Sequence, residues 1–332
     1  MSRPRNCPLL VGIEGGGTKT TCLVVGSDGS VKGAGSGGPS NVLAVGKDRA
    51  RESVRAAVRG ATGGRGLDEE ALAVCAGAAG AGSPEGKRMM QEVLQELHLS
   101  GRCVVVHDGV ISLMAATGGR PGIVIAAGTG SMCFGMNSSG KYARSSGWGY
   151  VLGDEGSGYD IARRAMTAAL RAHDLRGPQT ALEQKLVKRL GLSSIEDLVK
   201  LVYVDAMPRD QMSALAPLVL EAAREGDAVA IDILSHAGTE LGLAVVAVAK
   251  QLGMADDDFD VATDGGILEG FGHFVADCLW SVVLRSAPHA KMTRARFRPV
   301  VGAIMIAAKE AGIELDESFL KRLEMGTRGL EL

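Results

Sequence analysis

The chain has 332 residues, of which 46% are hydrophobic and 22% are charged, and its formal net charge is −2 at neutral pH. This length predicts two domains, and the composition excludes a disordered chain. The small net charge gives no electrostatic reason to expect a nucleic acid or an anionic membrane as partner. Six scattered cysteines, none of them spaced as C-x-x-C, argue against a zinc site and favour a reducing compartment. We therefore expect a cytoplasmic protein without a membrane anchor.

The N-terminal segment predicts a meander of three strands with a glycine turn after the first. An apolar strand at 9–13 leads into the turn at 14–18, which reads Glu-Gly-Gly-Gly-Thr. A second strand is predicted at 20–25, and a third ends in the glycines of 35–38.

The same plan recurs downstream, with a strand at 123–127, a turn at 128–131, and strands at 132–136 and 142–149. Thr18 and Thr129, Gly29 and Gly140, and Gly38 and Gly149 are each 111 residues apart. We interpret this constant spacing as an internal duplication that produced two related lobes.

Apolar residues at helical spacing predict helices after each meander. They include 50–61 and a helix that starts at Ser83-Pro84 in the first half, and 215–224 and 228–251 in the second. A further strand is predicted at 259–263, followed by helices at 301–311 and 316–325. We expect an α/β protein with a small lobe at 1–118 and a large lobe at 119–313, and the last helix, about 314–332, could join the small lobe.

Both glycine turns are candidate phosphate sites, because glycines let backbone N–H groups approach phosphate closely and the hydroxyls add donors. Neither turn is a P-loop, since no Gly-Lys-Ser/Thr opens a helix. For either turn alone a plain hairpin is the simpler interpretation, but a facing pair is more specific. The candidates are Gly16, Gly17, Thr18, Lys19 and Thr20 in the first turn, and Gly128, Thr129, Gly130 and Ser131 in the second.

A third glycine pair, Gly265-Gly266, follows its own strand and could let an adenine or a ribose lie against bare backbone. The alternative is a helix start capped by Asp264 or Thr263, and the sequence leaves both open.

Asp108 closes an apolar strand and precedes a predicted helix at 110–116. An N-cap role alone would explain it. The functional interpretation is a general base, because phosphoryl transfer to a hydroxyl needs a group that accepts the proton. His107 is expected to point away from Asp108, since adjacent side chains on a strand face opposite sides.

The segment 147–159 is dense in turn and polar residues. Gly147, Asp154 and Glu155 could hold a sugar through backbone and carboxylate acceptors. The alternative is a capped loop whose acidic residues start the helix at 161–170, and both can hold. For Trp148 core packing is the favoured interpretation, although an aromatic face can also line a sugar site.

The order of these motifs, with Ser40-Asn41 included, resembles the N-acetylglucosamine kinases of the sugar kinase/actin-like ATPase superfamily, which group with benzoyl-CoA reductase activator ATPases. The resemblance extends from about residue 11 to 270. It implies two actin-like (ribonuclease H-like) lobes with ATP and Mg²⁺ in an interlobe cleft. A homodimer that acts on a small sugar is the expected assembly.

Carried over residue by residue, the resemblance implies that Asp108 deprotonates the 6-hydroxyl of the sugar and that Glu14 holds Mg²⁺ through water. The two glycine turns would bind phosphate and Gly265-Gly266 the adenosine. The implied sugar contacts are Asn41, Asp108, Gly147, Trp148, Asp154 and Gly158.

One departure affects the substrate. After Asn41 the chain lacks the aromatic residue that some relatives place beside the sugar, so N-acetylglucosamine, glucosamine and glucose all stay open. Two other classes of protein share the fold. An ATPase that activates an iron–sulfur partner would need clustered cysteines, and a sugar-responsive regulator would normally carry a DNA-binding segment before the first meander.

Overall fold

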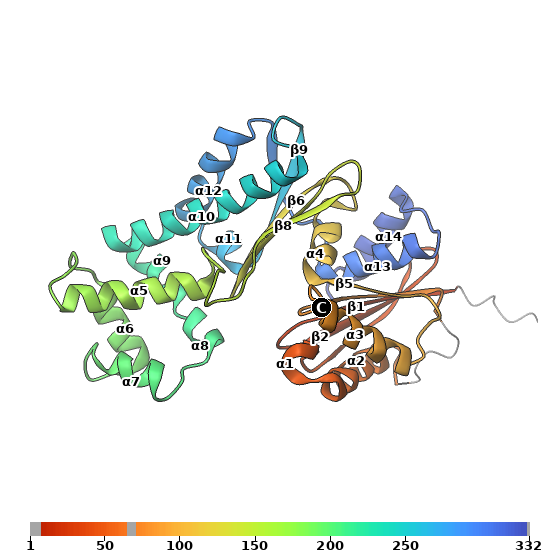
Figure 1. Ribbon diagram of the computed structural model, residues 1–332, viewed down its shortest axis with the longest axis horizontal. Helices are drawn as coiled ribbons and strands as arrows, with labels where there is room; N and C mark the ends of the chain where they lie inside the picture. Colours follow the sequence, from red (N-terminus) through yellow and green to blue (C-terminus); the bar gives the residue numbers. More distant parts are fainter. Residues whose placement is uncertain (1–7, 65–70, 331–332) are drawn as a thin grey trace, which may run out of the picture. The chain divides into compact units, whose positions relative to one another are not determined.

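The computed structural model describes residues 8–64 and 71–330, and the chain divides into two compact units. Unit 1 comprises Met1–Arg120 and Ala295–Leu332, and unit 2 comprises Pro121–Arg294. Each unit is built on a five-stranded mixed sheet with helices packed against it (Figure 1).

The sheet of unit 1 has the strand order β3-β2-β1-β4-β5. The first three strands form an antiparallel meander, and β4 and β5 continue from β1 in parallel. The strands are β1 (Leu9–Gly15), β2 (Thr20–Gly26), β3 (Val31–Gly37), β4 (Ala73–Ala78) and β5 (Cys103–His107). The helices are α1 (Val42–Val45), α2 (Lys47–Ala61), α3 (Pro84–Glu96), α4 (Asp108–Thr117), α13 (Pro299–Glu310) and α14 (Glu317–Thr327).

Alternation along the strands of unit 1 gives the sheet two buried faces. Leu10 and Leu23 lie in one apolar core with residues of α4, α13 and α14. Val11 and Val24, their neighbours along the chain, lie in a second core with residues of α2 and α3. The sheet is therefore covered on both sides, as expected for strands that are buried along most of their length.

The sheet of unit 2 has the order β10-β9-β6-β7-β8. Its strands are β6 (Gly122–Ala127), β7 (Ser131–Met136), β8 (Tyr142–Ser146), β9 (Phe259–Asp264) and β10 (Ala290–Arg294). Its helices are α5 (Gly158–His173), α6 (Leu182–Leu190), α7 (Asp197–Tyr203), α8 (Arg209–Ser213), α9 (Ala216–Arg224), α10 (Ala228–Leu252), α11 (Gly266–Gly270) and α12 (His273–Ser286).

The two sheets confirm the duplication. When each is read from the third strand of its meander, both have the order third, second, first, and then two parallel strands. The second strands begin at Thr20 and Ser131 and the third strands at Val31 and Tyr142, so each pair is 111 residues apart. The predicted α/β fold of two actin-like lobes is thus confirmed.

The units differ in what connects the third strand to the fourth. Among the described residues of unit 1 this connection holds only α1 and α2, whereas in unit 2 it holds the six helices α5–α10. Of the helices described, α10 alone is long and apolar enough to cross a membrane by its length and composition. In its apolar segment, 56% of the residues are buried, and α10 packs on α12, α9 and β7 as a core helix does.

The second predicted boundary was wrong. Residues 295–313 were assigned to the large lobe, but α13 packs on α4, β1 and β4 of unit 1. Two glycines explain the close fit. A Cβ at Gly12 would lie 2.8 Å from the Val300 carbonyl oxygen, and one at Gly302 would overlap the Ile111 carbonyl. The α14 helix also belongs to unit 1, where Arg322 donates to the Asp28 carbonyl.

Candidate functional site

In unit 1 the candidate phosphate turn and the candidate base, Asp108, lie along one edge of the sheet. Gly15 pairs with Ala78, and Ala78 pairs with His107, so β1, β4 and β5 end side by side. The glycine turn follows β1, and Asp108 follows β5. The carboxyl ends of parallel strands are where open α/β sheets usually bind ligands.

The first glycine turn is closed by a hydrogen bond of 2.9 Å from the Gly16 N–H to the Lys19 carbonyl. Gly17, Thr18 and Lys19 are exposed, as a phosphate site requires. Thr20 is fully buried, and its hydroxyl lies 2.7 Å from both the Gly38 carbonyl and the Ser40 Oγ. The Thr20 hydroxyl is therefore not available for its predicted role as a phosphate donor, because it is already bonded within the protein.

Asn41 lies beside this turn, because the Gly16 carbonyl accepts from the N–H groups of Ser40 and Asn41. Asn41 is the N-cap of α1, and its Oδ1 accepts from the Leu43 N–H at 3.2 Å. A Cβ at Gly80 would lie 2.6 Å from Oδ1, so Gly80 leaves room for this side chain. Neither Ser40 nor Gly80 was predicted to shape the site.

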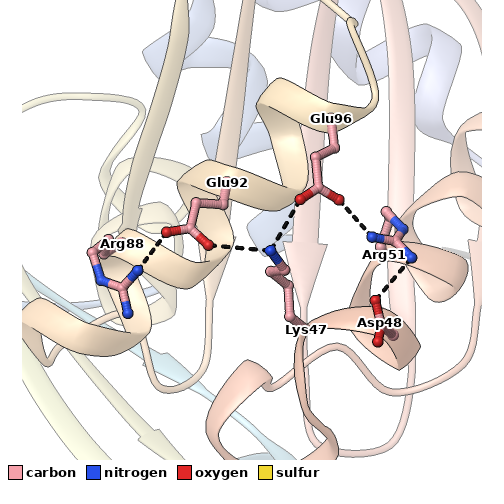
Figure 2. A network of polar contacts seen from close by, with 6 residues as sticks. All are labelled: Lys47, Asp48, Arg51, Arg88, Glu92 and Glu96. Atoms are coloured by element: carbon pink, nitrogen blue, oxygen red, sulfur yellow. Dashed lines mark hydrogen bonds and ion pairs between the residues drawn. The ribbon is translucent and has the colours of Figure 1, made fainter.

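A charged network ties α2 to α3 next to α1. Figure 2 shows Lys47 between two carboxylates of α3, Glu92 at 3.3 Å and Glu96 at 3.0 Å. Arg51 lies 2.5 Å from Glu96 and 2.8 Å from Asp48, and Arg88 is paired with Glu92. These side chains are partly or largely exposed, so the network strengthens the helix pair without making a buried ionic site.

Asp108 is the first residue of α4, and its side chain is 28% exposed. The prediction that His107 points away was wrong, since its Nδ1 lies 2.7 Å from Asp108 Oδ1. The strand ends at His107, so alternation does not extend to Asp108. The Gly109 N–H lies 3.0 Å from the same Nδ1 and donates to it, so the His107 side chain caps α4. Gly109 N–H, 2.9 Å from Oδ1, also donates to that oxygen.

The turn of unit 2 repeats that of unit 1 with a shorter loop. Gly128 N–H donates to the Gly130 carbonyl at 2.9 Å, and Thr129 is exposed. Ser131 occupies the position of Thr20, is buried, and donates to the Glu155 carbonyl at 2.7 Å. In both units the second strand therefore uses its first hydroxyl to hold the loop that follows the third strand.

The Gly265-Gly266 pair lies at the same edge as this turn. Gly265 has a φ of +94°, and a Cβ there would lie 2.5 Å from the Ala127 carbonyl oxygen. The predicted helix start is present, since α11 begins at Gly266, but Gly265 is its N-cap, in place of Asp264 or Thr263. Gly266 is exposed, which leaves its backbone open to a ligand.

The loop after β8 presents Gly147 and Trp148 at its start. Trp148 is 65% exposed, so the favoured interpretation of core packing was wrong. The Arg144 guanidinium lies 4.2 Å from the centroid of its ring. At the far end of the loop Gly158 is buried, and its N–H donates to the Gly128 carbonyl at 2.8 Å. Gly158 therefore joins the loop at 147–157 to the glycine turn of unit 2.

Asp154 is the most buried carboxylate of this loop, with 4% of its surface exposed and a φ of +58°. Burial raises its pKa above the ordinary value, while the neighbouring Arg209 acts to lower it. Arg209 Nη2 donates to Asp154 Oδ2 at 2.6 Å. A non-glycine residue in this backbone region is strained by about 1–3 kcal/mol, and such strain is common at functional sites.

A second carboxylate, Asp160, fixes the same loop from within α5. It accepts from the Gly156 N–H at 3.2 Å, from Arg164 at 2.9 Å and from Arg163 at 2.8 Å. Burial alone would raise the pKa of Asp160, but the two arginines and the backbone N–H outweigh it and the pKa is lowered.

The short helix α8 was missed as part of the site. Its first residue, Arg209, contacts Asp154, and its Nη2 would lie 2.4 Å from a Cβ added at Gly130. Its last residue, Ser213, packs on Gly158 in the same way. The sequence at 209–213 could not predict these contacts, because their partners, Asp154 and Gly158, lie more than 50 residues earlier in the chain.

The comparison with known proteins assigns the family. The model of the BadF/BadG/BcrA/BcrD ATPase family matches residues 11–307. The chain belongs to this ATPase family. The match includes both glycine turns, Asp108, Asp154 and Arg209, so the elements described above lie within the region that defines the family.

Two curated proteins match this chain over almost its full length. An N-acetylmuramic acid/N-acetylglucosamine kinase from Clostridium acetobutylicum is 34% identical over 302 residues, which cover 91% of this chain and 98% of the relative. An N-acetyl-D-glucosamine kinase from Dictyostelium discoideum is 31% identical over 311 residues, which cover 90% and 97%. The resemblance to N-acetylglucosamine kinases is thus confirmed.

A solved structure from Chromobacterium violaceum, itself provisionally assigned as an N-acetylglucosamine kinase, has a TM-score of 0.73 to this chain. It is 26% identical, and the match covers 90% of this chain and 99% of that one. The ATPase family member therefore shares its fold with that protein along nearly its full length.

Proposed function

We propose that the protein is an ATP-dependent kinase that phosphorylates the 6-hydroxyl of an amino sugar, with N-acetylglucosamine as the leading substrate. The observation that carries the proposal is the pair of curated relatives, each over 30% identical across about nine tenths of the chain and each named for N-acetylglucosamine phosphorylation. The groups proposed below for this reaction come from the sites described above.

Asp108 is the proposed base. Its Oδ1 accepts from the Gly109 N–H and lies 2.7 Å from His107 Nδ1, which leaves Oδ2 to accept the proton of the sugar hydroxyl. Phosphoryl transfer is catalysed mainly by positioning and charge neutralisation, so a carboxylate fixed at one oxygen suits the task. The proposed sugar contacts are Asn41 of unit 1 and Gly147, Trp148 and Asp154 of unit 2.

The two glycine turns are the proposed phosphate binders, through Gly16, Gly17, Thr18 and Lys19 in unit 1 and Thr129 and Gly130 in unit 2. Gly265 and Gly266 are proposed to accept the adenosine. In this proposal the buried hydroxyls of Thr20 and Ser131 act on the shape of the turns, because both are bonded within the protein.

Magnesium is the expected metal. Among the described residues no group of three or more His, Cys, Asp or Glu side chains could hold an ion by itself. Mg²⁺ commonly keeps several waters and is bound through phosphates with one or two carboxylates. Glu14, half-buried at the end of β1, is such a carboxylate and would hold the ion through water. When bound, the ion would neutralise charge on the phosphates.

The choice of sugar is the open part of the proposal. The Clostridium relative is named for N-acetylmuramic acid as well as N-acetylglucosamine. A coupled assay of ATP consumption with glucose, glucosamine, N-acetylglucosamine, N-acetylmannosamine and N-acetylmuramic acid would rank the candidates. Turnover with glucose alone would replace the amino-sugar proposal by a glucokinase.

An ATPase that activates an iron–sulfur partner is less well supported. The described cysteines lie in separate places, and Cys22, Cys75 and Cys133 are buried. Burial raises the pKa of Cys22 to about 12 and raises that of the other two as well. Iron–sulfur clusters are held by thiolates, so these three thiols are poor ligands. A cluster absorbance in the purified protein would favour the activator instead.

We also propose a cytoplasmic location, since the reaction consumes ATP, and a homodimer, which sedimentation would test.

The main test of the function is the variant Asp108→Asn. We expect kcat to fall by roughly 10²–10⁴-fold while ATP still binds, because a general base contributes about that much. The control is Asp48→Asn, an exposed carboxylate of α2. Near-normal kcat in Asp108→Asn would remove the proposed base.

A further inference from the structure

One ion pair lies between two of the proposed binding segments of unit 2. Arg209, at the start of α8, donates from Nη2 to Asp154 Oδ2 at 2.6 Å. A Cβ added at Gly130 would lie 2.4 Å from the same Nη2 and 2.8 Å from Asp154 Oδ2. The guanidinium thus lies against both the loop at 147–157, which holds proposed sugar contacts, and the glycine turn of unit 2.

The surroundings of Arg209 restrict its position. Its guanidinium carbon lies 5.4 Å from the centroid of the Tyr150 ring, within the range of a cation–π contact. Its Nε is buried and has no hydrogen-bond partner within 8–64 and 71–330. An unsatisfied buried donor is costly, and its presence at a site calls for an explanation. Here Nη2 donates to Asp154, while Nε is the buried donor left without an acceptor among the described residues.

Asp154 needs such a partner if it is to accept hydrogen bonds from a sugar. Only the ionised carboxylate is an acceptor at both oxygens. Burial acts against that form and raises the pKa, as does the neighbouring Glu155. Arg209 is the cation that opposes both, assisted by backbone groups of Gly149 and Ser131.

We propose that Arg209 is a positioning residue for sugar binding, which holds the Asp154 carboxylate in place for the sugar hydroxyls and acts on the sugar only through Asp154. This inference rests on the proposed kinase function. It gives a role to α8, which packs on the loop at 147–157 and on the start of α5. The sequence did not predict that α8 belongs to the site.

The test compares Arg209→Gln and Arg209→Lys with the wild type by steady-state kinetics from pH 5.5 to 9. For Arg209→Gln we expect KM for the sugar to rise roughly ten- to hundred-fold, the range for losing a hydrogen bond to a charged group. KM for ATP should stay within about two-fold. The acidic limb of kcat/KM for the sugar should move to higher pH, because Asp154 loses the cation that lowers its pKa.

Arg209→Lys keeps the charge and should keep the acidic limb where the wild type has it, with a smaller rise in KM for the sugar. If Arg209→Gln is unfolded by circular dichroism, this variant decides, and a folded Arg209→Lys with a displaced limb would overturn the inference. The matched control is Arg176→Gln, since Arg176 pairs with Asp174 at the same 2.6 Å but on an exposed surface. We expect this control to match the wild type.

An unchanged pH profile in Arg209→Gln, or a rise in KM for ATP equal to that for the sugar, would contradict the inference and leave the kinase function intact. A wild-type protein that turns over none of the sugars would instead remove the function, and the inference with it. The wild-type assay therefore separates the two failures.

Discussion

The two units hold equivalent loops with different chemistry. In unit 1 the loop after the third strand is fixed by uncharged bonds, from Thr20 to Ser40 and from Leu43 N–H to Asn41. In unit 2 the equivalent loop is fixed by two buried carboxylates, Asp154 and Asp160, with their arginines. Buried charges respond to pH and to the loss of one partner far more than neutral hydrogen bonds do. We therefore expect the loop of unit 2 to be more sensitive than the loop of unit 1 to pH and to the loss of a charged partner.

The largest effect in unit 2 is expected for Gly130→Ala. A Cβ there would displace Arg209 and Asp154, and a misplacement of about 1 Å can cost roughly 100-fold in rate. We expect kcat/KM for the sugar to fall by about that factor, measured by the coupled assay. Gly270→Ala is the control, because no atom lies within 4 Å of its added Cβ. Equal activities of the two variants would show that Arg209 is free to move away.

A smaller effect, on stability, is expected for Asp160→Asn. The folded-state pKa of Asp160 is lowered, so its ionised form stabilises the fold above the ordinary pKa of 3.8, and this stabilisation is lost as the pH falls through the folded-state value. We expect the variant to lose about 1.5–3 kcal/mol at pH 7, and the difference from wild type to vanish at strongly acidic pH. Urea unfolding at several pH values measures this.

The control is Asp174→Asn. Asp174 pairs with Arg176 on the surface, so this variant should lose less than about 1 kcal/mol of unfolding free energy. A loss for Asp160→Asn that stays constant down to pH 3 would mean that the amide, not the missing charge, is responsible.

Thr20→Val and Ser131→Ala test the shared part of the two units. Each removes a buried hydroxyl and leaves a loop acceptor unpaired, which costs about 1–3 kcal/mol. We expect similar losses in both, independent of pH between 5 and 9, as measured by urea unfolding. A pH-dependent loss in Thr20→Val would break the contrast between a neutral and a charged loop.

The smallest effect is expected for Lys47→Met in unit 1. Lys47 joins Glu92 and Glu96 in the network of Figure 2, but these groups are about one-third exposed. Exposed ion pairs contribute about 0–1 kcal/mol and are screened by salt. The loss should therefore stay below about 1 kcal/mol and shrink at high salt, while kinase activity is retained. A larger loss would mean that the network sets the position of α1 and Asn41.

Much of this protein follows from the sequence alone. Strand and turn patterns, which are local features, predicted both meanders, and their constant spacing of 111 residues predicted the duplication. The Ser83-Pro84 helix start, α9, α10 and both glycine turns were likewise predicted from local patterns. Each of these needs only neighbouring residues to be read.

The tertiary structure decided the features that depend on distant segments. It placed α13 on β1 through Gly12, paired His107 with Asp108, exposed Trp148, and brought Arg209 to Asp154 across 55 residues of chain. The short strands β4 and β10 were missed for the same reason, since their pairing partners are far away in the sequence. Local propensity fixes where elements begin, whereas packing decides which side chains meet.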